Sequence, residues 1–381
     1  MSDETTAAED AAAGKAKRKR IGAAVFTILL AVGAVLAFFF RDDLNEDGLR
    51  GVFGLGGDTA AESDEFTYEI GSGQVFAVAG NDLAVATASS IQLLDAAGRT
   101  VFKQVVSYNT PAVIGTAWGA LFCDLGGTAC VPVRADGEVR TLHPAGKLIT
   151  ANMNDSGYVA LTTEAAGYKA LVTVYDAADE ARYQWWSGTG YVLKACVSPD
   201  DQLLAVLCAE TDGGKLHVFR MDSETELASA AFPGELPFDL AFLGNDTLCA
   251  VSEEAFSFFA ADGSLKNRFD LGQYYLLDYD LSSQSFAAVY VSAYRTASGG
   301  LLETLGLDGR LLGYAEIERD VTSLSAAGQQ VLAMTAAGIT VYDRSMEALE
   351  THEGLVTAKK AVLRADGAIL LLSAYAAEKI D

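Results

Sequence analysis

The sequence lacks the common catalytic signatures. It contains no Gly-x-Ser-x-Gly elbow, His-Glu-x-x-His zinc motif, phosphate-binding glycine loop or dinucleotide fingerprint. Histidine occurs only at His143, His217 and His352, which lie far apart along the chain. The five cysteines have no Cys-x-x-Cys spacing, which zinc sites commonly use. We therefore predict a non-enzymatic protein without catalytic residues, a metal site or a bound cofactor.

Positive charge is scarce as well. The 27 lysines and arginines are outweighed by 51 aspartates and glutamates, which gives a formal net charge of −24. This balance argues against a nucleic-acid partner, because an acidic protein repels the phosphate backbone. Prolines (6) and charged residues (20%) are few, whereas 50% of the 381 residues are hydrophobic. A packed core is therefore expected, and frequent glycine (37) beside short apolar runs favours an all-β fold.

A long uncharged and strongly apolar run lies near the N-terminus. Residues 21–40 carry no charge, and they follow a small, polar tail, residues 1–20, that ends in a basic cluster. Twenty helical residues span ~30 Å, the thickness of the hydrocarbon core of a bilayer. Because basic residues mark the cytoplasmic side, we predict a disordered cytoplasmic tail and a single-pass transmembrane signal anchor with its N-terminus inside.

A cleaved signal peptide is the alternative to this anchor. The apolar run is longer than that of a usual signal peptide, and Ala37-Phe38-Phe39-Phe40 does not form a small-x-small cleavage site. An uncleaved anchor is thus favoured. Residues 41–64 are rich in glycine and acidic residues and are predicted to form a flexible linker to an extracytoplasmic domain, residues 65–381.

From residue 65 onward a repeat dominates. Eight short apolar strands each follow a turn, and successive turns are 38, 37, 44, 45, 38, 45 and 38 residues apart. The residues that mark these turns are Asn81, Gly119, Ser156, Asp200, Asn245, Ser283, Gly328 and Asp366. A second turn that begins with aspartate recurs seven times between them. A period of this size with four strands in each unit predicts a β-propeller of eight four-stranded blades, or of seven if one unit is degenerate.

The ends of the chain suggest how the ring closes. The last unit offers two strands, 358–363 and 369–374, and one spare strand, 66–70, precedes the first complete unit at 75–106. Pairing the spare strand into the last blade would cover open strand edges. Cys123 and Cys130 flank Gly126-Gly127 and would face each other across a hairpin at this turn. Their spacing fits a disulfide, but buried free thiols are the favoured state.

The recurring Asp-Gly turns, as in Ala135-Asp136-Gly137 and Leu307-Asp308-Gly309, resemble those of WD40-like and quinoprotein-like β-propellers. The whole layout, a basic tail, one apolar helix and a propeller, resembles a family of membrane-anchored propellers of unknown function from Gram-positive anaerobes. The Gly-His and Trp-Asp signatures of true WD40 repeats are missing, and so are the recurrent Thr-Gly and Trp positions of quinone-binding propellers. The resemblance therefore implies no quinone cofactor and supplies no functional residues.

Because successive strands of a blade run in opposite directions, their connections alternate between the two ends of the blade. We therefore predict that the propeller has two faces with different connections. The short Asn/Asp/Gly turns share one face, and more varied connections share the other. Because exposed Tyr, Trp and Arg make binding hot spots, we predict that the second face binds a partner. Its candidate residues are Tyr108, His143, Tyr168, Trp185, Trp186, Tyr191, Phe232, Tyr274, Tyr275, Tyr294 and Arg295.

The function predicted from this layout is a protein-binding or assembly scaffold on the outer side of the cytoplasmic membrane. Its expected partner is another envelope protein. The alternative is a surface module that binds a glycan or cell-wall polymer on the same aromatic residues. An enzyme centred on the channel of the propeller is the third hypothesis, because paired carboxylates can meet there, but no acidic residue is expected to recur at inner-strand positions.

Overall fold

The computed structural model describes residues 65–296, 299–354 and 358–380. The predicted cytoplasmic tail (1–20), signal anchor (21–40) and linker (41–64) lie outside these ranges. Within them, no helix has the length and apolar character needed to cross a membrane.

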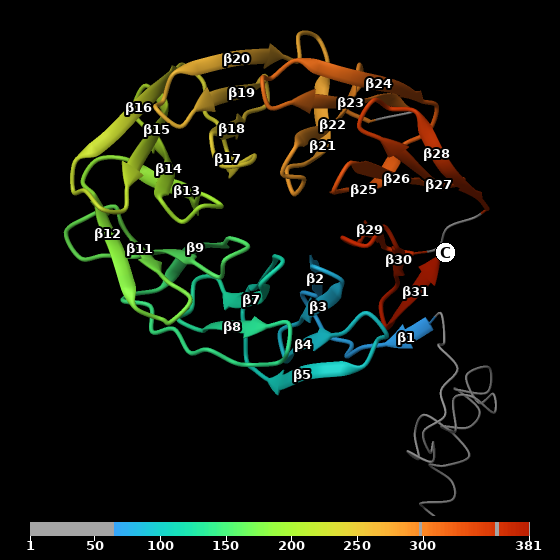
Figure 1. The fold of residues 1–381 in the computed structure, drawn as a ribbon, viewed down its shortest axis with the longest axis horizontal. Coiled ribbons are helices and arrows are strands. Elements are labelled where there is room, and N and C mark those ends of the chain that lie inside the picture. Colours follow the sequence, from blue (N-terminus) through green and yellow to red (C-terminus); the bar gives the residue numbers. More distant parts are fainter. Residues whose placement is uncertain (1–64, 297–298, 355–357, 381) are drawn as a thin grey trace, which may run out of the picture. The chain divides into compact units, whose positions relative to one another are not determined.

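The described chain forms eight small antiparallel sheets arranged as a ring around a central channel, which confirms the eight-bladed all-β propeller (Figure 1). We number the blades along the chain. Blade 1 comprises β2 (Val75–Ala79), β3 (Asp82–Ala86), β4 (Ser90–Leu94) and β5 (Thr100–Val105), and blade 2 comprises β6 (Pro111–Gly115), β7 (Gly119–Asp124) and β8 (Cys130–Arg134). Blade 3 comprises β9 (Leu148–Met153), β10 (Val159–Thr163), β11 (Ala170–Tyr175) and β12 (Ala181–Ser187), and blade 4 comprises β13 (Tyr191–Val197), β14 (Leu203–Glu210), β15 (Gly213–Arg220) and β16 (Glu226–Pro233).

The second half of the ring repeats this order. Blade 5 comprises β17 (Asp239–Phe242), β18 (Thr247–Val251), β19 (Ala255–Ala260) and β20 (Leu265–Asp270), and blade 6 comprises β21 (Tyr275–Asp280), β22 (Phe286–Ser292), β23 (Gly300–Gly306) and β24 (Leu311–Ile317). Blade 7 comprises β25 (Val321–Ala327), β26 (Gln330–Thr335), β27 (Gly338–Asp343) and β28 (Ala348–Glu353). Blade 8 comprises β29 (Lys360–Leu363), β30 (Ile369–Leu372), β31 (Ala376–Ile380) and β1 (Glu65–Thr67).

The core consists of separate apolar layers between neighbouring blades. In β22, Ala287 and Val289 pack against Phe256 and Phe258 of blade 5. The alternate residues of β22 pack on the opposite side, against blade 7. Because successive side chains of a strand point to opposite faces, a middle strand that is buried on both faces is apolar at most positions. This is why the middle strands read as continuous hydrophobic runs in the sequence.

The ring closes through the two ends of the described chain, as the sequence predicted. Strand β1 pairs antiparallel with β31, with Phe66 opposite Ala377. The buried Tyr68 hydroxyl shares its single proton between the carbonyl oxygens of Ser373 (2.9 Å) and Ala376 (2.8 Å). The prediction that the C-terminal unit ends after two strands was wrong. It holds three strands, because residues 376–380 continue the sheet and β1 supplies only the outermost one.

Blade 2 departs from the four-stranded pattern. It has three strands, and its fourth is reduced to an isolated bridge between Val133 and Val139. The buried Arg140 side chain crosses to blade 3 at this point. Its guanidinium donates to Asp179 Oδ1 (2.5 Å), to Gly157 O (2.9 Å) and to Asp176 O (2.6 Å), and it lies 5.0 Å from the ring centroid of Trp118. Hydrogen bonds and packing from one side chain thus join two blades where a strand is missing.

The recurring aspartate turns have a structural role. Asp95, Asp176 and Asp343 each accept backbone N–H groups two and four residues further on. Such Asx turns reverse the chain between the third and fourth strands. At the left-handed position of these turns glycine is usual, as at Gly263 with φ 77°, but Asp179 and Met346 take it with φ 66°. The aspartates therefore build the fold and are not free to bind a ligand.

Cys123 and Cys130 lie directly opposite each other on β7 and β8, in the register that the hairpin turn predicted. Their Sγ atoms are 3.3 Å apart, and both are buried free thiols. The five described cysteines are all buried.

Asp82, at the start of β3, gives a prediction for pH. Burial, together with the nearby Asp95 carboxylate, raises the pKa of Asp82 from its usual value to about 6, against the smaller opposing effect of Arg364. The folded state therefore binds this proton more tightly than the unfolded state, so stability falls as the pH rises from about 4 through 6. Asp82→Asn is expected to raise the free energy of unfolding by roughly 1–2 kcal/mol at pH 8, and by about half of that at pH 5.

Urea unfolding of both proteins at pH 5 and pH 8 measures this difference. The matched control is Glu180→Gln, because that glutamate lies in an exposed turn. An Asp82→Asn effect that is zero at pH 8, or larger at pH 5 than at pH 8, would contradict the assignment.

Candidate binding face

The two ends of the blades carry different connections. Turns between the first and second and between the third and fourth strands lie on one end, which we name the turn face. The remaining connections lie on the opposite end, the loop face. Loop-face connections vary in length, from two residues between β14 and β15 to seven between β22 and β23. Turn-face connections range from two residues between β2 and β3 to five between β4 and β5, so the longest connections lie on the loop face.

The structure places the eleven predicted residues in different environments. Tyr108 and Phe232 are buried between blades, and Trp185 and Tyr274 are largely covered by the same layers. His143 is exposed, but its carbonyl accepts a hydrogen bond from Tyr175, at the turn-face end of β11, which places it away from the loop face. The six residues that remain are exposed and lie at the loop-face ends of strands or in loop-face connections: Tyr168, Trp186, Tyr191, Tyr275, Tyr294 and Arg295.

Blades 3 and 4 bring three of these rings close to a lysine. Tyr168 and Trp186 have ring centroids 6.5 Å apart at a tilt of 51°. Beside them, Lys169 Nζ lies 4.5 Å from the ring centroid of Tyr191 and donates a hydrogen bond to its hydroxyl (3.1 Å). We name Tyr168, Lys169, Trp186 and Tyr191 the aromatic cluster. Its rings keep open faces toward solvent, as residues that bind flat apolar or sugar surfaces do.

Blades 5 and 6 form a cavity of about 430 Å³, which we name the Tyr275 pocket. Its lining consists of Phe238, Glu253, Tyr275, Leu276, Leu277, Asp278, Tyr279 and Arg295. The Arg295 guanidinium lies 4.9 Å from the ring centroid of Tyr275, and the Phe238 and Tyr279 rings are 6.1 Å apart. The Tyr279 hydroxyl donates to Asp239 Oδ2 (3.0 Å), which fixes that ring.

Sequence reasoning found Tyr275 and Arg295 but missed Phe238 and Glu253. Phe238 ends the connection from β16 to β17, and Glu253 lies in the turn from β18 to β19. Both connections reach the loop face of blade 5 and meet the loops of blade 6. The sequence could have indicated these two residues only through their positions in the repeat. Connections from the second to the third strand, and from the fourth strand to the next blade, all lie on the loop face.

The family of unknown function DUF5711 matches residues 61–351. The chain belongs to the DUF5711 family. The resemblance to a propeller family of unknown function is thereby confirmed, while a membrane anchor and an origin in Gram-positive anaerobes stay predictions.

One solved structure supports the fold of this DUF5711 protein, which is similar to the C-terminal WD40 domain of Sif2, with a TM-score of 0.55, 12% identity and coverage of 83% of this chain and 98% of that chain. BamB from Moraxella catarrhalis is matched at a TM-score of 0.49 and 11% identity, over 83% of this chain and 98% of that chain. No curated protein matches the sequence. At these identities the likeness concerns the fold alone.

The channel of the DUF5711 ring corrects one expectation. Acidic residues do occur on inner strands, at Asp239 of β17 and at Asp278 and Asp280 of β21. Asp239 is paired with Lys194 Nζ (2.9 Å), and Asp280 accepts the N–H groups of Ser282 (2.7 Å) and Ala326 (2.9 Å). These carboxylates hold neighbouring inner strands together. Asp280 lines the turn-face end of the channel, a cavity of about 570 Å³.

Asp278 lies two residues before Asp280 on β21, and its Oδ1 accepts the N–H of Tyr279 (2.9 Å). Burial, followed by the nearby Asp280 carboxylate, raises its pKa above the usual value. Among the residues that the structure describes, no three His, Cys, Asp or Glu side chains gather as metal ligands do.

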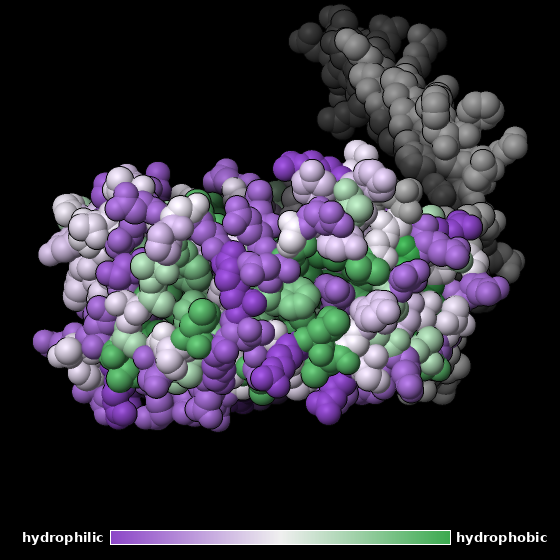
Figure 2. All heavy atoms as spheres, turned by 90° about the horizontal axis from the view of Figure 1, so that it is seen from above, coloured by the Kyte–Doolittle hydropathy of each residue, from purple (hydrophilic) through white to green (hydrophobic). Residues whose placement is uncertain are grey.

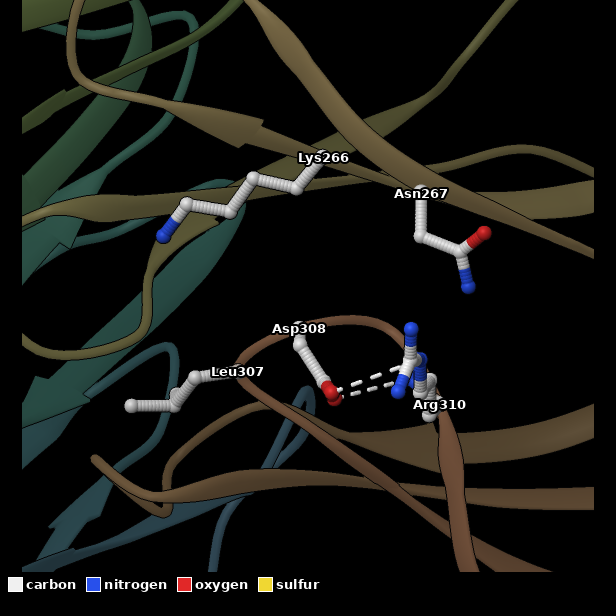
Figure 3. Close-up of a pocket in the computed structure, with 5 residues that line it drawn as sticks. All are labelled: Lys266, Asn267, Leu307, Asp308 and Arg310. Atoms are coloured by element: carbon white, nitrogen blue, oxygen red, sulfur yellow. Dashed lines mark hydrogen bonds and ion pairs between the residues drawn. The ribbon is translucent and has the colours of Figure 1, made fainter.

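The outer rim of the DUF5711 ring is a weaker candidate for a binding surface than the loop face. Figure 2 shows apolar patches on the side of β20 and β24 that are interrupted by hydrophilic residues. Lys266, Asn267, Leu307, Asp308 and Arg310 surround a rim cavity of about 450 Å³ (Figure 3). Asn267 Nδ2 donates to Gly309 O (2.7 Å), and Arg310 lies 3.6 Å from Asp308. The Asn267–Gly309 hydrogen bond joins blade 5 to blade 6, so the rim cavity is a junction between blades.

Proposed function

We propose that this DUF5711 protein is a non-enzymatic, membrane-anchored scaffold that binds another envelope protein through its loop face. The observation that carries the proposal is the gathering of exposed aromatic rings on that face. Tyr168, Trp186, Tyr191, Tyr275 and Tyr294 are 40–68% exposed, and a cation accompanies both the aromatic cluster and the Tyr275 pocket. Large rings that remain exposed on a rigid scaffold are the residues most used as hot spots.

The direction of β1 shows at which end the described chain enters the ring. Glu65 pairs with Glu378 and Thr67 with Ala376, so β1 runs from the turn face toward the loop face. The described chain therefore enters the ring at the turn face, at the opposite end of the blades from the exposed aromatic rings. If residues 21–40 anchor the chain, a flexible linker of residues 41–64 would allow a separation of roughly 25–30 Å from the membrane.

A glycan or cell-wall polymer is the second candidate partner. The specific observation in its favour is the aromatic cluster, because tilted, open Tyr168 and Trp186 rings can stack on sugar rings as readily as on protein side chains.

Site-specific crosslinking tests the proposal. A photo-reactive amino acid replaces Tyr294, which is 68% exposed on the loop face, and in a matched control replaces the exposed Arg310 on the turn face. The expected result is a discrete protein adduct from position 294 on intact cells and none from position 310. An adduct to wall polymer alone would favour the second candidate. Equal adducts from both positions, or none from position 294, would overturn the loop face as the binding surface.

A further inference from the structure

The Tyr275 pocket has the walls of a cation-binding site. The rings of Phe238, Tyr275 and Tyr279 line it, and the first two remain 42% and 40% exposed. Aromatic faces carry negative charge and attract ammonium and guanidinium groups, most strongly where water is partly excluded. A cavity of about 430 Å³ is large enough for one long side chain.

Two carboxylates complete the lining. Glu253 is exposed at the mouth, and among the described residues it has no ion-pair partner. Asp278 lines the wall, half-buried. Burial and the neighbouring Asp280 raise its pKa, whereas hydrogen bonds from the Tyr279 and Leu324 backbone and the nearby Lys360 oppose this shift. The chain as a whole carries a net charge of −24, which steers basic partners toward it.

Arg295 of the protein itself shows the interaction that such a ligand would make. Its guanidinium lies 4.9 Å from the centroid of Tyr275 and forms no ion pair with a described carboxylate. Most described arginines of the ring are instead paired with aspartates or glutamates, as Arg99 is with Asp95 and Arg220 with Asp222. Arg295 thus occupies an aromatic face that another cation could share or take over.

We propose that the Tyr275 pocket binds a lysine or arginine side chain of the partner protein. The inference rests on the proposed function, since it names the chemistry by which the loop face recognises its partner. Three rings and two carboxylates favour a cation over an anion, and the single positive charge at the site, Arg295, is already engaged with Tyr275.

Small capped amino acids test the pocket without knowledge of the partner. The purified full chain in detergent is titrated by calorimetry and by NMR with N-acetyl-arginine amide and N-acetyl-lysine amide. N-acetyl-norleucine amide serves as the neutral control and N-acetyl-glutamate amide as the anionic one. The expected result is binding of the two cationic probes and at least fivefold weaker binding of the other two.

Substitutions then separate cation from anion recognition. Glu253→Gln and Tyr275→Ala are each expected to weaken binding of the arginine probe about fivefold. Arg295→Gln should leave the affinity unchanged or raise it, because it removes a competing cation. The matched control is Tyr191→Ala in the aromatic cluster, which should have no effect. Thermal unfolding of each variant confirms that the ring is intact.

Opposite outcomes overturn the inference. If the glutamate probe binds best and Arg295→Gln abolishes that binding, the pocket recognises anions. If norleucine binds as well as arginine, or no probe binds, the pocket does not recognise a cation. Crosslinking from position 294 is scored independently. Adducts without probe binding would reject the pocket chemistry alone, and probe binding without adducts would reject the scaffold role alone.

Discussion

A chain that begins at Gln74, and so lacks β1, is expected to lose roughly 5 kcal/mol of unfolding free energy or to become insoluble. The deletion removes the outer strand of blade 8, the hydrogen bond from the Tyr68 hydroxyl, and the burial of Phe66 and Tyr68. Each net hydrogen bond contributes about 1 kcal/mol and each buried ring about 2 kcal/mol. The open edge of β31 would also invite pairing between molecules.

Urea unfolding and size-exclusion chromatography measure this loss. The matched control is a chain that begins at Glu62, which keeps β1 and lacks the preceding residues. We expect the control to unfold cooperatively as a monomer. Equal stability of the two chains would show that β1 does not close the ring. A third variant, Tyr68→Phe, isolates the hydroxyl and is expected to cost roughly 1–2 kcal/mol.

Arg140→Met is expected to lower the unfolding free energy by roughly 3 kcal/mol. The substitution keeps much of the packing on Trp118 but leaves the Asp179 carboxylate and the carbonyls of Gly157 and Asp176 without their donor. Only 8% of the Arg140 side chain is exposed, so water cannot readily replace the lost bonds.

The matched control for this variant is Arg134→Met, six residues earlier in the same blade. Arg134 pairs with Asp136 and Glu138 on the surface, where water screens the ion pairs, so the loss is expected to be much smaller. Denaturant unfolding of both variants measures the two losses of unfolding free energy. Equal losses would show that Arg140 is an ordinary surface arginine and that blade 2 is held to blade 3 by its apolar layer alone.

Much of the fold could be predicted from the sequence because each blade repeats its turns. In the Asx turns at Asp95, Asp176 and Asp343, the carboxylate accepts a backbone N–H only two residues further on. Such turns can therefore be recognised from a short stretch of sequence. Strand direction then separated the two faces. Blade 2 could not be anticipated in the same way. Its Asp136-Gly137 turn is intact, and the loss of pairing beyond Val139 depends on Arg140 reaching into the next blade.

The candidate site was only partly predictable for a related reason. Tyr108 and Phe232 occupy the same kind of position as Tyr191 and Tyr275, yet the layer between two blades covers the first pair and leaves the second pair exposed. Burial of this kind depends on the neighbouring blade, not on local sequence. The inner-strand carboxylates were missed because Asp239, Asp278 and Asp280 lie on only two of the eight inner strands, so no repeating pattern marks them.

The closing strand has a consequence for the order of folding. Glu65 and Glu378 are neighbours in the ring but lie at opposite ends of the described chain. At a synthesis rate of 5–20 residues per second, β1 waits roughly 15–60 s before its partner strand β31 exists. During that interval blades 1 to 7 can form one after another, each against its predecessor. The ring stays an open arc with Phe66 and Tyr68 unprotected, and it becomes a closed, cooperative unit only when the last residues arrive.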